Sequence, residues 1–406
     1  MGVGLRRAVR AAISLGGPEA VYAAKKGAIA LRARLPAPLL RARHAAALAA
    51  LDARIAEARG VVVYLPTINW GYLHQRPHQL LRELGRRGYV GVFCTCNPAA
   101  DAVEGLREVE PNVFLCADPR LVAHLARPIL WLNWTVNEAW LRAFREPRVV
   151  YEYIDELEVF SMHCRRMHAD HDALVRRADV VVASADRLHA AIRAARPDAV
   201  LAPNGVHAPD FRGREGEAPP EDLARIVALG RPIVGYYGAL ARWLDFELLN
   251  RVTQDGAELS FVVIGPDHDG SAARIASRPN VHVLGERPYG ELARYSRRFD
   301  VAIIPFEVSE VTRSTSPVKL FEYMAAGAPI VTTPMDECRK YRSVTTAATP
   351  AEFLSAVRAA VGRRGDAAYQ ALLSREVQQN TWGERVDRVL AALDAGATAP
   401  AERRRA

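Results

Sequence analysis

A repeated alternation of short apolar runs with helical stretches constrains the fold of this chain more than any other feature. The first run, Val61–Leu65, is β-branched and continuous, as is typical of strands buried in a parallel sheet. Helical patterns at 76–87, 139–145 and 185–195 separate several later runs. These later runs lie at 89–95, 113–116, 129–132, 148–153, 179–183 and 199–201. Strands that alternate with helices predict a doubly wound parallel sheet.

The same alternation restarts after a stretch rich in Gly, Pro and acidic residues at 209–231, which we interpret as a linker. Strands are expected at 232–237, 260–264, 281–284, 301–305 and 329–333, with helices from 246 and at 289–298 and 317–326. The sequence therefore predicts an α/β protein with two facing, doubly wound, Rossmann-like domains. Ligands are expected in a cleft between them, at the carboxyl ends of the strands.

The expected domain boundaries follow from these patterns. A first domain is expected at 60–208, completed by C-terminal helices at about 376–395, and a second domain at 232–375. Residues 1–59 are expected to form a basic helical extension broken near Pro36 and Pro38. A disordered tail is expected at 396–406.

The positive charge of the chain is concentrated in that extension. The full sequence of 406 residues has a net charge of +8. Residues 1–59 hold eleven Lys and Arg against three Asp and Glu, which leaves the remainder neutral. We therefore expect no nucleic-acid partner. Near the N-terminus, Leu5, Val9, Ala12 and Ile13 recur at helical spacing beside Arg6, Arg7 and Arg10, so either an anionic membrane surface or a loosely packed solvated helix fits the extension.

Cysteine usage and hydropathy favour the cytoplasm, with a peripheral position on the inner face of the membrane as an option. The five cysteines show no paired spacing, which is typical of a reducing compartment without structural zinc. No apolar run approaches the length needed to span a bilayer.

The most informative local segment runs from Ser316 to Val331. Ser316 is a good N-cap and Pro317 suits the first helical position, so a helix should start here and offer its N-terminus to an anion. Lys319 lies in the first turn, and Glu322 follows three residues later on the same face. An anion site followed by a carboxylate suits the diphosphate and ribose of a nucleotide. An ordinary capped helix with an exposed Lys–Glu pair fits the same residues equally well.

With its neighbours, this segment resembles the donor half of GT-B-fold glycosyltransferases of the family-four, or group-one, type. The resemblance spans about residues 60–395 in ordered blocks, and it does not cover residues 1–59. The blocks are Gln75–His78, Ala178–Ser184, Pro203–Val206, Val234–Leu240 with Trp243 and Asp245, Asn280–Gly285, Phe299–Phe306, Ser316–Val331 and Asn380–Trp382. The resemblance implies transfer of a sugar from a nucleotide-sugar, with no cofactor, no required metal and retention of configuration.

The resemblance also implies the donor-site residues. Ser316, Pro317, Lys319 and Glu322 correspond to the diphosphate and ribose contacts, with Lys319 and Glu322 also counted as catalytic. The remaining donor candidates lie in two loops: Gly238, Arg242, Arg287 and Tyr289. In the usual pattern a second glutamate stands eight residues before the ribose glutamate. Here that position is Ser314, and Glu310 is a candidate replacement.

The acceptor side is expected in the first domain. The loop after the first strand and the start of the next helix supply five candidates: Trp70, Gly71, His74, Gln75 and Arg76. Asp155 follows the strand at 148–153 and is a candidate general base if the configuration inverts, or otherwise a hydrogen-bond acceptor. Trp131, Asn133, Trp134 and Asn137 fit buried packing better than sugar stacking.

We expect no metal site. His163, Cys164, His168 and His171, with Asp170 and Asp172 among them, offer metal-binding groups, but a solvated helix surface explains such a mixture better.

Three functions remain open at this point. The first is a glycosyltransferase that builds a surface polysaccharide or glycolipid on a glycan or lipid-linked acceptor. The others are a nucleotide-sugar epimerase of the same architecture and an inactive nucleotide-sugar-binding scaffold.

Overall fold

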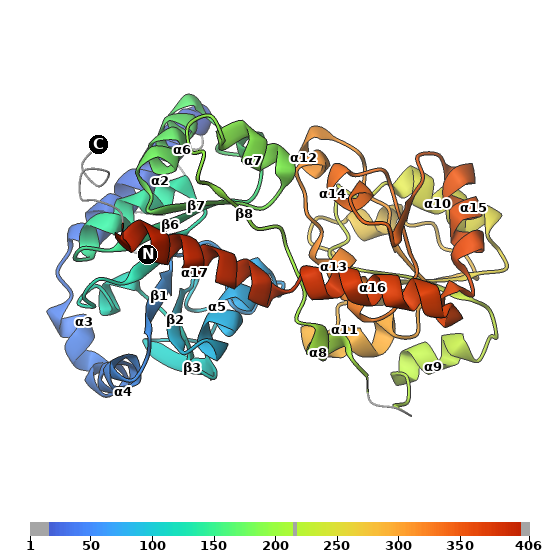
Figure 1. Ribbon diagram of the computed structural model, residues 1–406, viewed down its shortest axis with the longest axis horizontal. Helices are drawn as coiled ribbons and strands as arrows, with labels where there is room; N and C mark the ends of the chain where they lie inside the picture. The colour runs from blue at the N-terminus through green and yellow to red at the C-terminus, as the bar shows by residue number, and fades with distance from the viewer. Residues whose placement is uncertain (1–15, 214–216, 399–406) are drawn as a thin grey trace. The chain divides into compact units, whose positions relative to one another are not determined.

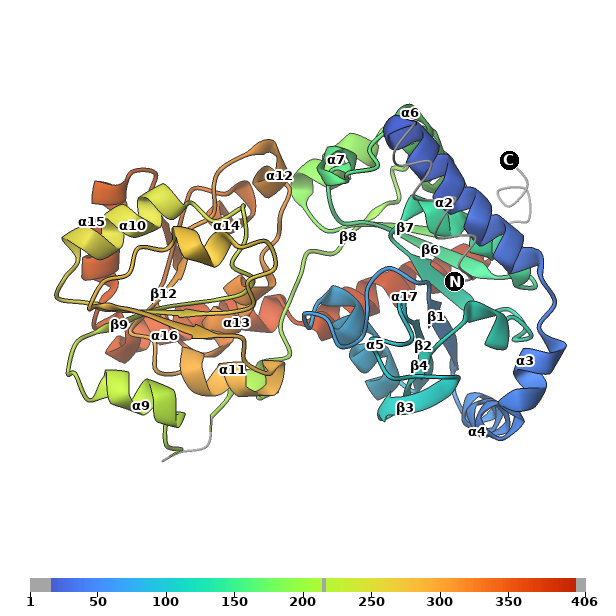
Figure 2. The same ribbon diagram turned by 180° about the vertical axis from the view of Figure 1, so that it is seen from behind.

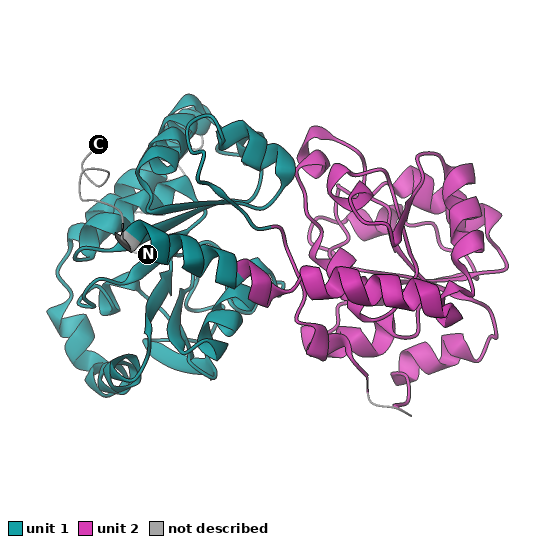
Figure 3. Ribbon diagram, in the orientation of Figure 1, with its two compact units in different colours: residues 1–202, 386–406 teal, residues 203–385 magenta. Residues whose placement is uncertain are grey.

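The computed structural model of the chain describes residues 16–213 and 217–398, which form two compact units. Unit 1 comprises residues 1–202 and 386–406, and unit 2 comprises residues 203–385 (Figure 3). The last helix, α17 (Trp382–Thr398), begins in unit 2 and continues in unit 1. Each unit is built on its own sheet and is described here by itself.

Unit 1 contains an eight-stranded sheet in the order β3-β4-β2-β1-β5-β6-β7-β8 (Figures 1 and 2). All neighbouring strands are parallel except the edge pair of β3 and β4. The strands are β1 (Gly60–Tyr64), β2 (Tyr89–Cys94), β3 (Leu106–Glu110), β4 (Val113–Cys116), β5 (Ile129–Leu132), β6 (Arg148–Tyr153), β7 (Val180–Ala183) and β8 (Val200–Leu201). The central strands are fully buried, as their continuous apolar sequences predict.

The helices of unit 1 connect these strands and extend N-terminal to them. They are α2 (Gly17–Arg34), α3 (Pro38–Arg43), α4 (Ala45–Ala56), α5 (Arg76–Arg86), α6 (Arg165–Arg177) and α7 (Asp186–Ile192), with the 3₁₀ helices η1 (Pro119–Leu121), η2 (Thr135–Ala143) and η3 (Leu157–Val159). The helix expected at 139–145 is therefore a 3₁₀ segment that begins four residues earlier.

Residues 17–56 pack into unit 1 rather than loosely on its surface. Tyr22 of α2 is completely buried, and its hydroxyl lies 2.8 Å from Thr135 Oγ1 and 2.7 Å from Asp170 Oδ2. Leu51 of α4 is also completely buried in the same core. Lys26 pairs with Glu138 and Asp170, each at 2.7 Å. Part of the positive charge of the extension is thus neutralised within the unit. The amphipathic pattern at 5–13 lies outside the described residues.

Unit 2 contains a six-stranded, all-parallel sheet in the order β11-β10-β9-β12-β13-β14. The strands are β9 (Ile233–Tyr237), β10 (Ser260–Ile264), β11 (Val281–Gly285), β12 (Val301–Ile304), β13 (Ile330–Thr332) and β14 (Val344–Thr346). The helices are α8 (Ala208–Phe211), α9 (Glu221–Val227), α10 (Phe246–Asp255), α11 (Tyr289–Ser296), α12 (Glu310–Arg313), α13 (Val318–Ala325), α14 (Asp336–Arg339), α15 (Pro350–Ala360) and α16 (Ala367–Gln379), with the 3₁₀ helices η4 (Ser271–Arg274) and η5 (Arg363–Gly365).

The strand order reverses between β9 and β12 in unit 2, and between β1 and β5 in unit 1. At such a reversal the connecting helices leave toward opposite faces, so the carboxyl ends of the two strands open a crevice for ligands. The segments that follow β9, β12, β1 and β5 are therefore the first places to look for a site.

Two segments differ from the sequence-based expectation. The stretch 209–231, predicted as a linker, contributes α9 and most of α8 to unit 2, where Phe211, Leu223 and Ile226 are buried in the core. The Pro and Gly residues around these short helices led to the linker prediction, although the helices carry apolar residues that belong to the core. Helix α17 reaches Thr398, so the first residues of the predicted tail are helical, and 399–406 lie outside the described residues. Within the described part of the chain, no helix is both long and apolar enough to cross a bilayer.

Candidate functional site

Three glycines end three neighbouring strands of unit 2 at the same edge of the sheet. Gly238, Gly265 and Gly285 follow or close β9, β10 and β11, and all three have positive φ, at 137°, 153° and 73°. A Cβ atom on Gly265 would lie 1.9 Å from the carbonyl oxygen of Gly238, so this close backbone approach requires glycine. The carboxyl edge of β9 to β11 is therefore a backbone surface without side chains at these positions.

Lys319 in the first turns of α13 extends to this backbone surface. A Cβ atom on Gly238 would lie 2.7 Å from Lys319 Cε and 2.9 Å from Nζ, so the side chain crosses directly over Gly238. The ammonium also lies 4.7 Å from the ring centroid of Phe306 and 5.3 Å from that of Tyr236. Within the described residues it forms no ion pair or hydrogen bond. Burial lowers the pKa of Lys319 to about 8, and the charge of Glu322 opposes this shift.

Glu322 is buried one turn further along α13, and both of its oxygens accept hydrogen bonds from phenols. Tyr237 donates to Oε2 at 2.7 Å, and Tyr289 donates to Oε1 at 2.9 Å. Burial raises the pKa of Glu322, and the two hydroxyls and Lys319 act against that rise. The phenols thus hold the carboxylate in one orientation beside the lysine, where it can accept hydrogen bonds from further hydroxyl groups.

The start of α13 differs by one residue from the prediction. The N-cap is Pro317, the helix begins at Val318, and no side chain caps this end among the described residues. Ser316 is instead held by Asn204, whose Nδ2 donates to the Ser316 carbonyl at 2.6 Å and whose backbone N–H donates to Oγ at 3.3 Å. The helix N-terminus, with its positive dipole end, is therefore open to an anion beside the lysine.

The two donor-site arginines predicted from the sequence occupy different surroundings. Arg287 is engaged by its own unit: Nη2 donates to Asp222 at 2.6 Å and Nε donates to the hydroxyl of Tyr295 at 2.9 Å. Arg242 is exposed, and its backbone N–H lies 3.3 Å from Asp269 Oδ2. The Arg242 side chain is thus the more exposed of the two, and the Arg287 side chain is 26% exposed.

The position of the missing second glutamate is enclosed. Ser314 is 1% exposed and ends α12. Glu310, the candidate replacement, lies at the other end of this short helix, exposed and paired with Arg313 at 3.0 Å. The structure gives no second buried carboxylate next to Lys319 and Glu322 from this segment of the described chain.

In unit 1, the loop after β1 is tied down by an acid that the sequence analysis did not single out. Asp101 accepts hydrogen bonds from the backbone N–H groups of Trp70, at 2.8 Å, and Gly71, at 2.7 Å. The Trp70 ring packs against His78 and Phe93 at centroid distances of 4.7 and 5.2 Å. The candidate acceptor loop is thus a defined structure at the strand reversal of unit 1.

The other acceptor candidates lie at the start of α5 and differ in their burial and contacts. Gln75 is the N-cap, and its backbone N–H donates to His78 Nδ1 at 3.1 Å. His74 is half-buried, with its ring 4.7 Å from that of His78. Arg76 is 5% exposed and its Nη2 lies 2.8 Å from Glu152, which is completely buried on β6. Arg76 is therefore a structural residue of the core and not the acceptor contact that its place in the motif predicted.

Asp155 follows β6, as expected, and its environment is unusual for a carboxyl group. Burial, with a smaller contribution from the charge of Glu156, raises the pKa of Asp155 to about 7. Within the described residues its side chain forms no hydrogen bond or ion pair. A carboxyl group that titrates near neutral pH can accept or release a proton under physiological conditions.

Four residues of these sites escaped the sequence analysis: Tyr237, Asp101, Glu152 and Asn204. Tyr237 had a usable signal, because it is the last residue of a central strand and immediately precedes Gly238. The other three contact partners that lie 30 to 112 positions away in the sequence, and no local sequence pattern predicts such contacts. The residues Trp131, Asn133, Trp134 and Asn137 lie in packing contacts, with Asn133 bonded to Thr67 and Asn137 to the Pro66 carbonyl.

A known protein family matches the part of unit 2 that contains the glycine-lined strand edge and α13. Residues 226–362 match the family model described as glycosyl transferases group 1. This range, which lies within unit 2, is therefore similar to the group 1 glycosyl transferases. The matched range includes β9 to β14 and therefore Gly238, Lys319, Glu322 and Tyr289.

Further comparisons extend beyond the range matched by the family model. The chain is 26% identical over 223 residues to a putative teichuronic acid biosynthesis glycosyltransferase, TuaH, of Bacillus subtilis. That match covers 52% of this chain and 55% of the relative, so it spans about half of that protein's length. Among solved structures, α,α-trehalose 6-phosphate synthase of Burkholderia multivorans gives a TM-score of 0.62 at 13% identity, over 84% of this chain and 99% of the other. Anabaena HepE in complex with UDP and glucose gives 0.60 at 15% identity, over 83% and 99%. The fold is GT-B.

Proposed function

We propose that this protein transfers a sugar from a nucleotide-sugar to a glycan or lipid-linked acceptor in the synthesis of a cell-surface polysaccharide or glycolipid. The observation that carries the proposal is the partly buried Lys319 side chain, whose ammonium lies over the glycine-lined strand edge without a carboxylate bound to it. A diphosphate is the partner that this cation lacks. The TuaH match favours a polysaccharide product, and HepE in complex with UDP and glucose favours a nucleotide-sugar donor.

In this proposal the donor lies against unit 2 in a defined order. The diphosphate contacts Lys319, the N-terminus of α13 and the backbone at Gly238. The ribose hydroxyls approach Glu322, whose carboxylate Tyr237 and Tyr289 already orient. When the glycosidic bond to the nucleotide breaks, negative charge grows on the departing diphosphate. Lys319 and the helix N-terminus stabilise that charge in a site prepared before the reaction begins.

We further propose that transfer needs no metal and retains the anomeric configuration. The cation and the helix N-terminus take the place that a divalent ion would hold at the diphosphate. Asp155 has two possible roles, which the product distinguishes. A retaining reaction needs no protein base, and Asp155 then binds an acceptor hydroxyl, whereas an inverting reaction would use it as the general base.

The test uses purified full-length protein with a panel of UDP-, GDP- and dTDP-sugars, membrane lipid extract and a chelator. The proposal predicts that sugar moves from one donor to a lipid or glycan fraction in the presence of the chelator. An isomerised donor would instead support an epimerase. Thermal stabilisation by the donor without turnover, in the presence of every acceptor fraction tried, would support an inactive binding protein.

The pKa of Lys319 gives the pH dependence of donor use. Because burial lowers this pKa to about 8, the free protein carries the ammonium below pH 8 and loses it above. We therefore expect kcat/KM for the donor to fall above pH 8, by up to about tenfold per pH unit. A rate profile from pH 6 to 10 measures this, and a constant kcat/KM up to pH 10 would contradict the role of Lys319.

Gly238→Ala should displace Lys319. A Cβ atom at this position would overlap the lysine side chain, and φ of 137° is unfavourable for alanine. We expect the affinity for the donor nucleotide to fall about tenfold or more, which corresponds to about 1.4 kcal/mol. Gly290→Ala is the matched control, because nothing lies within 4 Å of its Cβ position. Equal nucleotide affinity of Gly238→Ala and wild type, measured by titration, would argue against a phosphate site over Gly238.

We also propose that the N-terminal extension docks on an anionic membrane at the inner face of the cell membrane. The supporting feature is the junction of α2 and α3, where Leu31, Leu35 and Leu39 are 62%, 49% and 85% exposed. Arg34 and Arg43 are exposed beside them, and residues 31–43 contain no acid. Exposed leucines among basic residues suit the interface of an anionic bilayer.

Liposome binding tests this docking surface. Each arginine near an anionic surface contributes about 1 kcal/mol. Replacing Arg34 and Arg43 by alanine should therefore weaken binding to anionic vesicles by about 2 kcal/mol, roughly 30-fold. These positions are preferable to deletion of residues 1–59, which would remove the buried Tyr22 and Leu51. Arg225→Ala, an exposed arginine of unit 2, is the control. Undiminished sedimentation of the double variant with the vesicles would refute the proposal.

A further inference from the structure

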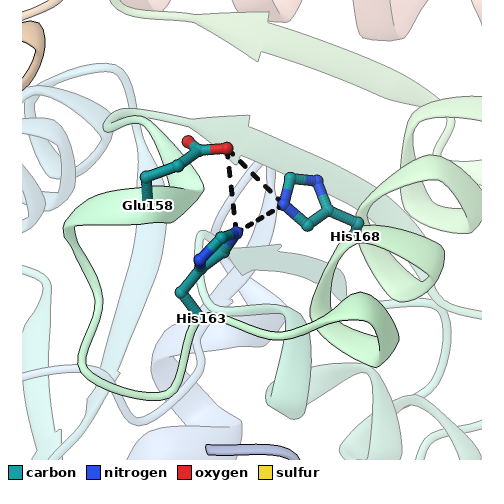
Figure 4. Close-up of side chains that lie close together, drawn as sticks. All are labelled: Glu158, His163 and His168. Carbon is teal, nitrogen blue, oxygen red and sulfur yellow. Dashed lines mark hydrogen bonds and ion pairs between the residues drawn. The ribbon is translucent and has the colours of Figure 1, made fainter.

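Two histidines and a glutamate meet on the surface of unit 1, between β6 and α6. Glu158 belongs to η3, His163 to the following loop and His168 to the first turn of α6. Figure 4 shows their three side chains pointing toward a common point. Glu158 Oε1 lies 3.7 Å from His163 Nε2 and 3.6 Å from His168 Nε2, and the two Nε2 atoms are 2.7 Å apart.

No cationic side chain neutralises this carboxylate. Among residues 16–213 and 217–398, Glu158 forms ion pairs only with these two histidines. The side chains are accessible, at 59%, 39% and 43% for Glu158, His163 and His168. The three potential ligand atoms lie within 4.8 Å of one another.

The geometry points to a binding site for a divalent transition metal such as Zn²⁺, with Glu158 Oε1, His163 Nε2 and His168 Nε2 as ligands. Two imidazoles and one carboxylate form a ligand set that Zn²⁺ accepts, with a fourth position open to water. At metal–ligand distances of about 2.0–2.1 Å, ligand atoms in a tetrahedron lie roughly 3.4 Å apart. The two Glu–His distances are already close to this value.

The His163–His168 distance is short for a metal site, and it describes the metal-free state. At 2.7 Å one imidazole donates a hydrogen bond to the other, so one Nε2 carries a proton. Metal binding requires that proton to move to Nδ1 and the rings to separate by less than 1 Å. Rotation of two partly exposed side chains allows both changes.

The neighbouring donors that the sequence groups with these histidines take other roles. His171 lies 2.7 Å from the hydroxyl of Tyr151, and Asp170 pairs with Lys26. Cys164 does not belong to the converging group. The sequence-based expectation of no metal considered those donors, and it missed Glu158, which reaches the histidines from η3.

The site goes beyond the proposed sugar transfer. All three ligands belong to unit 1, whereas the residues proposed to bind the donor belong to unit 2. A metal here would join η3 to α6 and so fix both ends of the loop 160–164 between them, and Asp155 lies three residues before Glu158. We assign it a role in ordering this loop.

Titration with Co²⁺ tests the site with a spectroscopic readout that does not depend on activity. We expect untagged full-length protein to bind one equivalent of Co²⁺ with the strong visible absorption of a four-coordinate site, and Zn²⁺ to displace it. His163→Ala and His168→Ala should each abolish the absorption, and Glu158→Gln should weaken Co²⁺ binding at least tenfold. The matched control is His124→Ala, a partly exposed histidine of the same unit that pairs with Asp52.

Hydrogen exchange provides the second measurement. Zn²⁺ should slow amide exchange in residues 160–164 of the wild type and leave it unchanged in His168→Ala. The inference is overturned if no stoichiometric Co²⁺ spectrum forms. It is equally overturned if His124→Ala loses as much binding as the cluster variants, because binding would then be nonspecific.

Discussion

Lys319→Ala should lower kcat/KM for the nucleotide-sugar roughly 30- to 1000-fold, which corresponds to a loss of about 2–4 kcal/mol of transition-state stabilisation. The ammonium lies over Gly238 without a bound carboxylate, so its removal leaves the growing charge of the diphosphate with the helix N-terminus and the backbone at Gly238 but no cation from α13. Stability should change little, because no hydrogen bond or ion pair within the described residues is lost. Initial rates with the true donor, measured at pH 7, provide the test.

Lys340→Ala is the matched control for this prediction. Lys340 is another lysine of unit 2, and it pairs with Glu337 at 2.6 Å rather than lying over the glycine edge. Its replacement should leave the transfer rate within about twofold of wild type. Near wild-type rates for Lys319→Ala would remove the phosphate assignment.

Glu152→Ala should destabilise unit 1 by about 3–5 kcal/mol. Glu152 is completely buried and Arg76 is 5% exposed, so the substitution leaves a buried guanidinium without its carboxylate partner. Removing one partner of a buried ion pair costs more than most single substitutions. Denaturant titration measures the effect, as the free energy of the unfolding transition that occurs at the lower denaturant concentration.

Two further variants separate the buried charge from general damage to the core. Replacing both partners, as in Arg76→Met with Glu152→Leu, should recover part of the lost stability, because neither charge then remains buried alone. Arg54→Ala removes the exposed pair with Glu108 and should cost less than about 1 kcal/mol. A Glu152→Ala effect no larger than that of Arg54→Ala would contradict a structural role for the pair.

The sequence predicted the strands and the helix at 317–326 well because these depend on local patterns. The continuous β-branched runs at 61–65 and 301–305 correspond to the buried strands β1 and β12. The helix at 317–326 became α13 at 318–325, with Lys319 and Glu322 on one face as the spacing required. Periodicity and helix-start residues carry this information over a few positions.

The errors arose where a residue's partner is distant in sequence. Arg76 was expected at the acceptor, but Glu152, 76 positions away, holds it in the core. For Arg287, a donor-site candidate, the sequence did not show that Asp222 of the supposed linker binds it, 65 positions away. The grouping of Glu158 with His163 and His168 was missed for the same reason, since Glu158 reaches the histidines from a separate 3₁₀ turn. A basic residue in a motif does not reveal whether a ligand or a buried acid will neutralise it.

The most direct test of the central proposal is calorimetric titration of UDP, GDP and dTDP into the full-length protein and its Lys319→Ala and Lys340→Ala variants. This measurement needs no knowledge of the acceptor. We predict that one nucleotide binds wild type and Lys340→Ala at one equivalent, and that Lys319→Ala binds it at least tenfold more weakly. No binding of any nucleotide, or equal affinity in Lys319→Ala, would contradict a nucleotide-sugar site on unit 2.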